Sequence, residues 1–262
     1  MGTDSFPFRT ALVTGASSGI GELMVETLAE AGVPTVAIAR REDRLLALAD
    51  RHPSVEVMVA DLLTDDGQTN VASRIAERDR PIELVVNNAG FGTNGTFHEL
   101  DVDRLTDEIE LNVAALMRLS HAALATMVPR GRGWLLNVAS VAGFQPAPQL
   151  AVYAATKAYV LSLSESLHAE VRASGVHVTA LCPGLTKTEF QRVSNTYRYA
   201  DKYPSVAWTS PELVVRTGLS DVAAGKAVSV PGLQYKALTS IASVTPRWLR
   251  RLASSRVRRG DP

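Results

Sequence analysis

The chain has 262 residues, of which 46% are hydrophobic and 21% charged, and this ordinary composition excludes a disordered, collagen-like or coiled-coil protein. Its 27 basic and 27 acidic side chains give a formal net charge of zero, which argues against nucleic-acid binding by the domain as a whole. The length suits one large α/β core, so we expect residues 1–262 to form a single domain.

Short apolar runs alternate along the chain with stretches of helical periodicity. The runs predict strands, at 11–13, 35–39, 55–59, 84–86, 134–138, 176–181 and 227–230. The stretches between them predict helices, at 20–31, 42–51, 65–78, 102–127, 152–173 and 211–223. Strands that are apolar throughout are covered on both faces, and parallel neighbours need crossover helices. The sequence therefore predicts a Rossmann-like, doubly wound parallel sheet of about seven strands, with ligands at the carboxyl ends of the strands.

A glycine-rich turn follows the first predicted strand and leads into a helix. Its glycines stand at positions 15, 19 and 21 of the run from Thr14 to Gly21. Without Cβ atoms the backbone can approach a pyrophosphate closely, and the helix start offers N–H groups and a positive dipole end. A turn that uses glycine only for its geometry is the alternative. We expect a nucleotide to contact Gly15, Ser17, Ser18, Gly19, Ile20 and Gly21.

Two arginines, Arg40 and Arg41, follow the second strand, where no acidic residue stands at the tip. An acid at this point accepts the ribose hydroxyls of NAD, whereas an arginine accommodates the extra phosphate of NADP. The planar guanidinium of Arg40 suits such a phosphate, and we expect Arg41 beside it to contact the cofactor too, so the sequence favours NADP(H) over NAD(H). Alternatively, both arginines are solvated at the start of the next helix.

Two further strand tips carry candidate cofactor contacts. Asp61 follows the third strand and could accept from an adenine amino group, with Leu62 against the ring, or else cap the next helix. The fourth strand ends in Asn87, Asn88, Ala89 and Gly90, which could leave the backbone close to a ribose or simply form a turn.

A tyrosine and a lysine stand four residues apart, at 153 and 157, at the start of a helix. This spacing places them on one helix face, where a lysine cation can stabilise the anion of a phenol that normally titrates near pH 10. Ser140 lies just past the fifth strand, where its hydroxyl could bond a substrate oxygen. Asn112 is a polar residue inside a long predicted helix. A packed tyrosine, an exposed lysine, a serine turn and a helix-bending asparagine are the structural alternatives.

Together these pieces resemble the short-chain dehydrogenase/reductase superfamily in its compact form, over about positions 8 to 232. The matching segments come in order: Thr14 to Gly21 with the spacing T-G-x-x-x-G-x-G, Asp61, Asn87 to Gly90, Asn112, Ser140, Tyr153 with Lys157, and Pro183, Gly184, Leu185 and Thr186.

The resemblance implies a hydride transfer between nicotinamide C4 and a carbonyl or alcohol carbon. It implies that Tyr153 is the general acid or base, that Ser140 orients the substrate oxygen, and that Lys157 bonds the nicotinamide ribose and lowers the phenol pKa. It further implies that Asn112 holds a water of the proton relay and that the 183–186 segment, with Thr186 at the carboxamide, contacts the cofactor. A homodimer or homotetramer is also implied by the resemblance.

The segment after the sixth strand is rich in aromatic residues, and we expect residues 186–210 to cover the substrate as a lid. Phe190 from this segment, with Phe91 and Phe144 at neighbouring strand tips, predicts an apolar pocket for a lipophilic carbonyl compound. Packing of these aromatics between subunits is the alternative.

The carboxyl-terminal segment concentrates positive charge. Residues 222–262 carry 8 basic side chains and 1 acidic one, whereas residues 1–221 carry 19 and 26. We expect residues 233–262 to form a basic extension with a helix opening at Thr245 and Pro246. The extension either docks on its own subunit or touches a membrane surface or an acidic partner.

The sequence indicates no metal site, because its histidines lack ligand spacing and Cys182 is the only cysteine. One cysteine, no leader and no spanning apolar run predict a soluble protein of the cytoplasm. We expect an NADP(H)-dependent oxidoreductase; a 3-oxoacyl thioester reductase and a non-catalytic NADP-binding regulatory protein are the alternatives.

Overall fold

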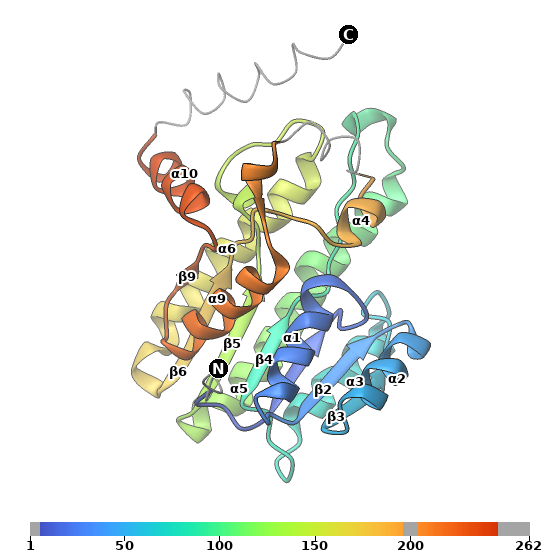
Figure 1. Cartoon of the computed structure of the whole chain (residues 1–262), viewed down its shortest axis with the longest axis vertical. Coiled ribbons are helices and arrows are strands. Elements are labelled where there is room, and N and C mark those ends of the chain that lie inside the picture. The colour runs from blue at the N-terminus through green and yellow to red at the C-terminus, as the bar shows by residue number, and fades with distance from the viewer. Residues whose placement is uncertain (1–5, 196–203, 246–262) are drawn as a thin grey trace.

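The computed structural model describes residues 6–195 and 204–245. A parallel sheet of seven strands lies at the centre, in the order β3-β2-β1-β4-β5-β6-β9, with helices on both faces (Figure 1). The predicted doubly wound α/β fold is confirmed. The strand order reverses between β1 and β4, and ligands of such sheets bind outside the carboxyl ends of the strands at this point.

The strands of the main sheet are short and largely buried. They are β1 (Ala11–Thr14), β2 (Thr35–Ala39), β3 (Val55–Val59), β4 (Leu84–Asn87), β5 (Gly133–Val138), β6 (Val176–Leu181) and β9 (Val228–Ser229). The predicted bounds of β2, β3 and β6 are confirmed at both ends. Two shorter strands, β7 (Leu185–Thr186) and β8 (Trp208–Thr209), pair in parallel beside the sheet.

The helices follow the strands in chain order. They are α1 (Gly19–Glu30), α2 (Glu42–Arg51), α3 (Asp65–Ala76), α4 (Val102–Ile109), α5 (Leu116–Arg130), α6 (Ala151–Val171), α7 (Phe190–Val193), α9 (Pro211–Ala223) and α10 (Leu233–Val244). Short 3₁₀ turns lie at Phe97–Glu99, Val141–Phe144, Arg172–Ser174 and Ser205–Ala207.

Two apolar cores hold the layers together, because successive side chains of a strand point to opposite faces. Ala11 and Val13 of β1 pack into the core under α1, α2 and α9. Leu12, between them, packs into the core under α3, α5 and α6. Both cores lie below the carboxyl ends of the strands, so the residues at those ends stand on a rigid base.

The long helix predicted at 102–127 is interrupted. A π-helical turn at Glu110–Ala115 separates α4 from α5, and such single wide turns are frequent at functional sites. By length and composition, the helical stretch Val102–Arg130 could cross a membrane. In this structure part of its apolar surface belongs to the core, where Leu119, Ala123 and Met127 are fully buried or nearly so, while Met117 and Val128 are exposed.

The last described helix, α10, ends just before Thr245, whose backbone N–H donates to the carbonyl of Ile241. Thr245 has the extended backbone, with φ −80° and ψ 127°, that an N-cap also adopts, so its place at the start of a helix stays a prediction. Helix α10 itself was not predicted, because its buried face depends on Tyr235 and Thr239 rather than on an apolar stripe. The helix predicted from Pro246 to Leu252 lies outside the described residues.

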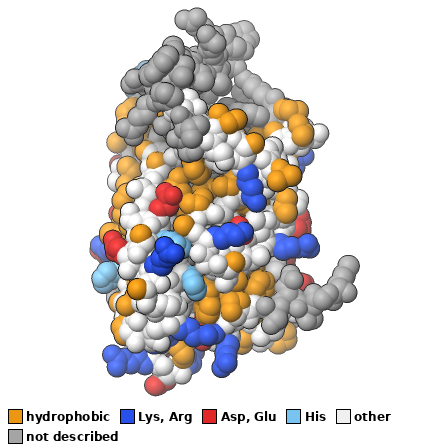
Figure 2. Space-filling model, turned by 90° about the vertical axis from the view of Figure 1, so that its left-hand side faces the viewer, with side chains coloured by type: hydrophobic (Ala, Val, Ile, Leu, Met, Phe, Trp, Pro, Cys, Tyr) orange, Lys and Arg blue, Asp and Glu red, His pale blue; other side chains and the backbone are white. Residues whose placement is uncertain are grey.

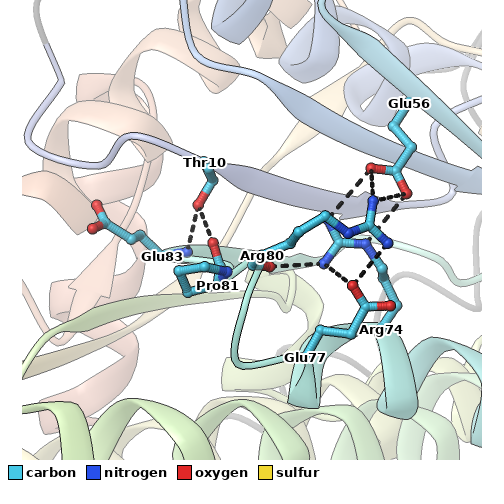
Figure 3. Close-up of polar contacts among 7 residues, drawn as sticks. All are labelled: Thr10, Glu56, Arg74, Glu77, Arg80, Pro81 and Glu83. Atoms are coloured by element: carbon cyan, nitrogen blue, oxygen red, sulfur yellow. Dashed lines mark hydrogen bonds and ion pairs between the residues drawn. The ribbon is translucent and has the colours of Figure 1, made fainter.

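An ionic cluster lies at the amino ends of the strands, opposite the carboxyl ends that form the candidate site. Arg74 of α3 is nearly buried and bonds both oxygens of Glu56 at 3.3 Å and the carbonyl of Arg80 at 3.0 Å (Figure 3). Arg80 pairs with Glu77 at 2.8 Å and with Glu56 at 3.2 Å. Beside the cluster, Thr10 joins the chain before β1 to the loop before β4. These contacts hold together the amino ends of the strands, away from the site.

On the side of the molecule drawn in Figure 2, Lys and Arg side chains are scattered among acidic and hydrophobic ones. This mixture agrees with the net charge of zero.

Candidate active site

One large cavity opens at the carboxyl ends of the strands. Its volume is about 930 Å³, at the upper end of the range of about 300–1,000 Å³ for small-molecule sites. The cavity brings together nearly all the predicted site residues, from the glycine-rich turn to the aromatic segment. Of the predicted site residues, Gly21 and Asn112 do not line it.

The glycine-rich turn has the backbone that glycine alone adopts easily. Gly15 and Gly19 have φ angles of 69° and 60°, in the left-handed region. A Cβ on Gly21 would lie 2.3 Å from the carbonyl oxygen of Gly15, so Gly21 permits close packing within the turn. Ser18 precedes α1 without capping it through its side chain, which leaves the N–H groups of the first turn available for an anion. The turn therefore fits a dinucleotide phosphate.

Arg40 stands at the cavity edge with a largely free guanidinium. Its side chain is 66% exposed and lies 3.7 Å from the carboxylate of Asp61, a loose surface pair. Asp61 also accepts the backbone N–H of Leu63 at 3.0 Å, which is a local turn. The helix-capping alternative for Asp61 is wrong, because Thr64 caps α3 by accepting the N–H of Gly67. Arg40 and Asp61 both line the cavity.

The tip of β4 is tied to the glycine-rich turn. The amide of Asn88 donates to the carbonyls of Thr14 and Gly15, at 2.9 and 3.3 Å. Asn87 instead points away from the cavity toward α5, where its amide donates to Asn137 at 2.9 Å and to Ser120 at 3.1 Å. A Cβ on Gly90 would lie 2.7 Å from Oδ1 of Asn112 and 3.5 Å from Nζ of Lys157, so the absence of a side chain lets this backbone line the cavity.

Ser140, Tyr153 and Lys157 converge on the inner end of the cavity. Ser140 follows β5 and accepts the N–H of Ala142 at 3.1 Å, which fixes its hydroxyl. Lys157 is buried, and its Nζ donates to the carbonyl of Val138 at 2.8 Å. The same Nζ lies 5.8 Å from the centre of the Tyr153 ring. The phenol, the hydroxyl and the ammonium thus lie around one point of the cavity.

Asn112 shapes the wall behind this point. Its Oδ1 accepts from the N–H of Phe91 at 3.1 Å, while its Nδ2 donates to the carbonyl of Phe91 at 2.7 Å and to Thr156 at 3.2 Å. The π-helical turn aims the amide at these partners. The side chain therefore holds the loop after β4, and its relation to a relay water stays a prediction.

Burial shifts the pKa values of the phenol and of the lysine. Burial raises the pKa of Tyr153 to about 12; the charge of Glu108 adds to this shift, and a hydrogen bond with Ser140 opposes it. Burial also lowers the pKa of Lys157 to about 8. Lys157 is not among the groups that shift the phenol pKa in this structure, so its lowering of that pKa stays a prediction.

Sequence reasoning missed Glu108, which is fully buried one helical turn before Asn112. Burial raises its pKa to about 6, although the Thr93 hydroxyl and the charges of Arg104 and Lys157 oppose the shift. No sequence signal marked it, since a glutamate in an amphipathic helix is normally solvated.

We expect the free energy of unfolding of Glu108→Gln, relative to that of wild type, to be higher at neutral pH than at acid pH. From about pH 4.5 to 6 the unfolded chain releases a proton that the folded chain retains, so stability falls with rising pH by about 2 kcal/mol. The neutral amide removes this loss. Urea unfolding of wild type and variant at pH 4.5 and 7.5 measures this difference in stability, and Glu99→Gln, at an exposed residue, is the control. The same stability difference from wild type at both pH values would contradict the assignment.

Two further residues unnoticed in the sequence brace the segment after β6. Gln191 donates to the carbonyl of Thr186 at 2.7 Å and accepts the N–H of Thr188 at 3.0 Å. The hydroxyl of Tyr235 accepts the N–H of Leu185 at 3.0 Å and donates to the carbonyl of Ala207 at 2.6 Å. Helix α10 thereby closes one end of the cavity.

Aromatic side chains line the part of the cavity beyond Ser140. Phe91, Phe144 and Phe190 all border it, and the Phe190 ring lies 5.5 Å from that of Tyr153. The aromatic residues at 197, 199 and 203 of the predicted lid lie outside the described residues.

Comparison with known proteins gives a consistent result. The family described as short chain dehydrogenase matches residues 9–198. An uncharacterized oxidoreductase of Myxococcus xanthus is 38% identical over 192 residues, which cover 72% of this chain and 76% of that protein.

Two solved structures are similar over most of their length. A short-chain dehydrogenase from Sphingobium yanoikuyae in complex with NADPH has a TM-score of 0.80 and 33% identity, covering 91% of this chain and 96% of that one. The bulky-bulky ketone specific alcohol dehydrogenase from Comamonas testosteroni has a TM-score of 0.76 and 30% identity, covering 91% and 95%.

Proposed function

The chain belongs to the short-chain dehydrogenase family of nicotinamide-dependent oxidoreductases, and from this premise we propose that it reduces a lipophilic carbonyl compound with NADPH. The observation that carries the proposal is one cavity that runs from the glycine-rich turn to Ser140, Tyr153 and Lys157. A site for cofactor phosphate and a group that moves a proton therefore share one space.

The preference for NADP(H) rests on Arg40. Its guanidinium borders the cavity, is mostly exposed and has only a loose partner in Asp61, so a phosphate can engage it at little cost. No acidic residue follows β2 directly to accept ribose hydroxyls in its place. The complex of the Sphingobium protein with NADPH supports the same choice.

The cofactor supplies the hydride, and the chain supplies the proton and the orientation. Tyr153 is the proton donor to the substrate oxygen, and its raised pKa keeps the phenol protonated at neutral pH. A developing alkoxide is nearly as basic as hydroxide, whose conjugate acid has a pKa of about 15.7, so donation from a phenol of pKa about 12 is downhill.

Ser140 and Lys157 prepare this proton transfer. The fixed hydroxyl of Ser140 is placed to bond the substrate oxygen and orient it toward Tyr153. Lys157 would hold the nicotinamide ribose, and its cation would stabilise negative charge on the phenol. Asn112 keeps the loop of Phe91 in place around them.

The substrate end favours a bulky, apolar compound. Beside the three phenylalanines, Val206 and Leu238 border the cavity, so a large hydrophobic group meets apolar contacts. The name of the Comamonas relative, specific for bulky-bulky ketones, agrees with this chemistry.

A substrate panel tests the proposal. NADPH absorbance is followed with bulky aromatic ketones, aliphatic aldehydes, steroid ketones and 3-oxoacyl thioesters, with Tyr153→Phe as the blank. We expect turnover of the bulky ketones at least about tenfold above the thioesters in kcat/KM, because apolar contacts differ by more than one methylene. A preference for thioesters would replace the substrate class, and NADPH binding without any turnover would favour a non-catalytic protein.

Other parts of the proposal concern assembly and location. Exposed apolar side chains on α5 and α6, among them Met117, Val128 and Tyr159, support a homodimer or homotetramer. A cytoplasmic location, the lid at 186–210 and a contact of the basic carboxyl-terminal segment with an anionic surface stay predictions, the last concerning mostly residues outside the described ranges.

A further inference from the structure

Arg41 makes contacts across the cavity that the sequence did not suggest. Its Nε and one terminal nitrogen donate to the hydroxyl and carbonyl of Ser17, at 3.1 and 3.2 Å. The other terminal nitrogen donates to a carboxylate oxygen of Glu189 at 2.9 Å. Each nitrogen of the guanidinium therefore has a partner within the chain, unlike the loosely paired Arg40.

Glu189 stands at the beginning of α7, which carries Phe190 as its first residue. The hydrogen bond from Arg41, together with its charge, holds the pKa of Glu189 below its usual range, so the carboxylate is ionised at neutral pH. Only about a third of either side chain is exposed, which limits screening of the pair by solvent. The preceding Thr188 also meets the glycine-rich turn, with its Cβ 3.1 Å from where a Cβ of Gly19 would lie.

The far end of α7 is held by separate contacts. Ser194 accepts the N–H of Gly92 at 2.9 Å, and Arg104 donates to the carbonyl of Val193 at 2.6 Å. Between these two anchored ends, Phe190 packs against the ring of Tyr153. The position of Phe190 beside the catalytic phenol thus depends on an anchor at each end of a short helix.

We propose that Arg41 and Glu189 are positioning residues that tie α7 to the glycine-rich turn and so set Phe190 against Tyr153, leaving recognition of the extra cofactor phosphate to Arg40. The inference rests on the proposed function and deepens it, because it divides two adjacent arginines between cofactor choice and placement of the substrate wall. Arg41 lines the cavity without being the residue that selects NADP(H).

Hydrogen exchange of the 188–195 amides tests the tie without turnover. The backbone bonds of Val193 and Ser194 to Glu189 and Phe190 report the order of α7. We expect Glu189→Gln to accelerate exchange about fivefold, the upper end for a partly exposed ion pair. Arg41→Met should do at least as much, and the double variant no more than Arg41→Met, since both changes break one contact. Glu42→Gln, which removes an exposed carboxylate beside Arg41, is the matched control.

Cofactor titrations and kinetics separate the two arginines. Arg40→Met should abolish most of the preference for NADPH over NADH, whereas Arg41→Met and Glu189→Gln should leave this ratio within about twofold. With the best ketone of the panel, Glu189→Gln should raise KM about fivefold with little change in kcat, because Phe190 loses its fixed place.

Three results would overturn the tie: unchanged exchange in Glu189→Gln, additive effects in the double variant, or loss of cofactor preference in Arg41→Met as large as in Arg40→Met. Failure of the wild-type chain to bind either cofactor would instead overturn the proposed function, and the exchange comparison would still decide on the tie.

Discussion

Tyr153→Phe is expected to lower kcat about a thousandfold, within the range of about 10² to 10⁴ for loss of a general acid or base. Phenylalanine keeps the ring that packs 5.5 Å from Phe190, so the cavity wall is preserved. It removes the only proton donor proposed for the substrate oxygen. Steady-state reduction of the panel's best ketone measures the loss, and NADPH titration should give an affinity within about twofold of wild type.

Tyr159→Phe is the matched control for this variant. Tyr159 lies on the same helix, two residues after Lys157, and its side chain is exposed. We expect this second loss of a phenol hydroxyl to leave kcat unchanged. Near-wild-type turnover by Tyr153→Phe would remove Tyr153 from the proton transfer, and equal losses in both variants would point to a structural effect of α6.

Arg40→Asp should reverse the choice of cofactor. The change deletes a phosphate ligand and places a carboxylate where an additional phosphate would lie, a combined penalty of about 3 kcal/mol, or roughly 150-fold in the ratio of NADPH to NADH kcat/KM. The effect on NADH should be small, because the new carboxylate can accept ribose hydroxyls. Measurements with both cofactors at low ionic strength give the ratio.

Arg44→Asp makes the same charge change on α2 at a residue that does not line the cavity. In this variant the ratio of NADPH to NADH kcat/KM should shift only by the weak, salt-dependent effect of a distant charge. An unchanged ratio in Arg40→Asp would remove Arg40 from the phosphate site, and equal shifts in the two variants would indicate a general effect of charge.

Much of the fold was predictable because its signals are local. The apolar run at Val176–Leu181 and the periodic stretch at Glu42–Arg51 were predicted with the observed bounds, since burial on both faces or on one stripe leaves a pattern within a few residues. The helix-bending alternative for Asn112 anticipated an interruption of the long helix. Its form, a π-helical turn at Glu110–Ala115, was not predictable, because Asn112 there bonds Phe91, 21 residues away in the chain. Helix α10 was missed for a similar reason, as Tyr235 is buried only by segments distant in the sequence.

By itself, the sequence determined the alternation of strands and helices, the glycine-rich turn and the four-residue spacing of Tyr153 and Lys157, because steric and hydrogen-bonding rules between near neighbours specify all three. Only the tertiary structure decided the partners of the charged and polar groups. It paired Arg41 with Glu189 across 148 residues, left Arg40 largely free, and buried Glu108 behind the site. Such pairings depend on how whole helices and strands pack. The type of a side chain alone predicts neither its burial nor which residue, distant in the sequence, it contacts.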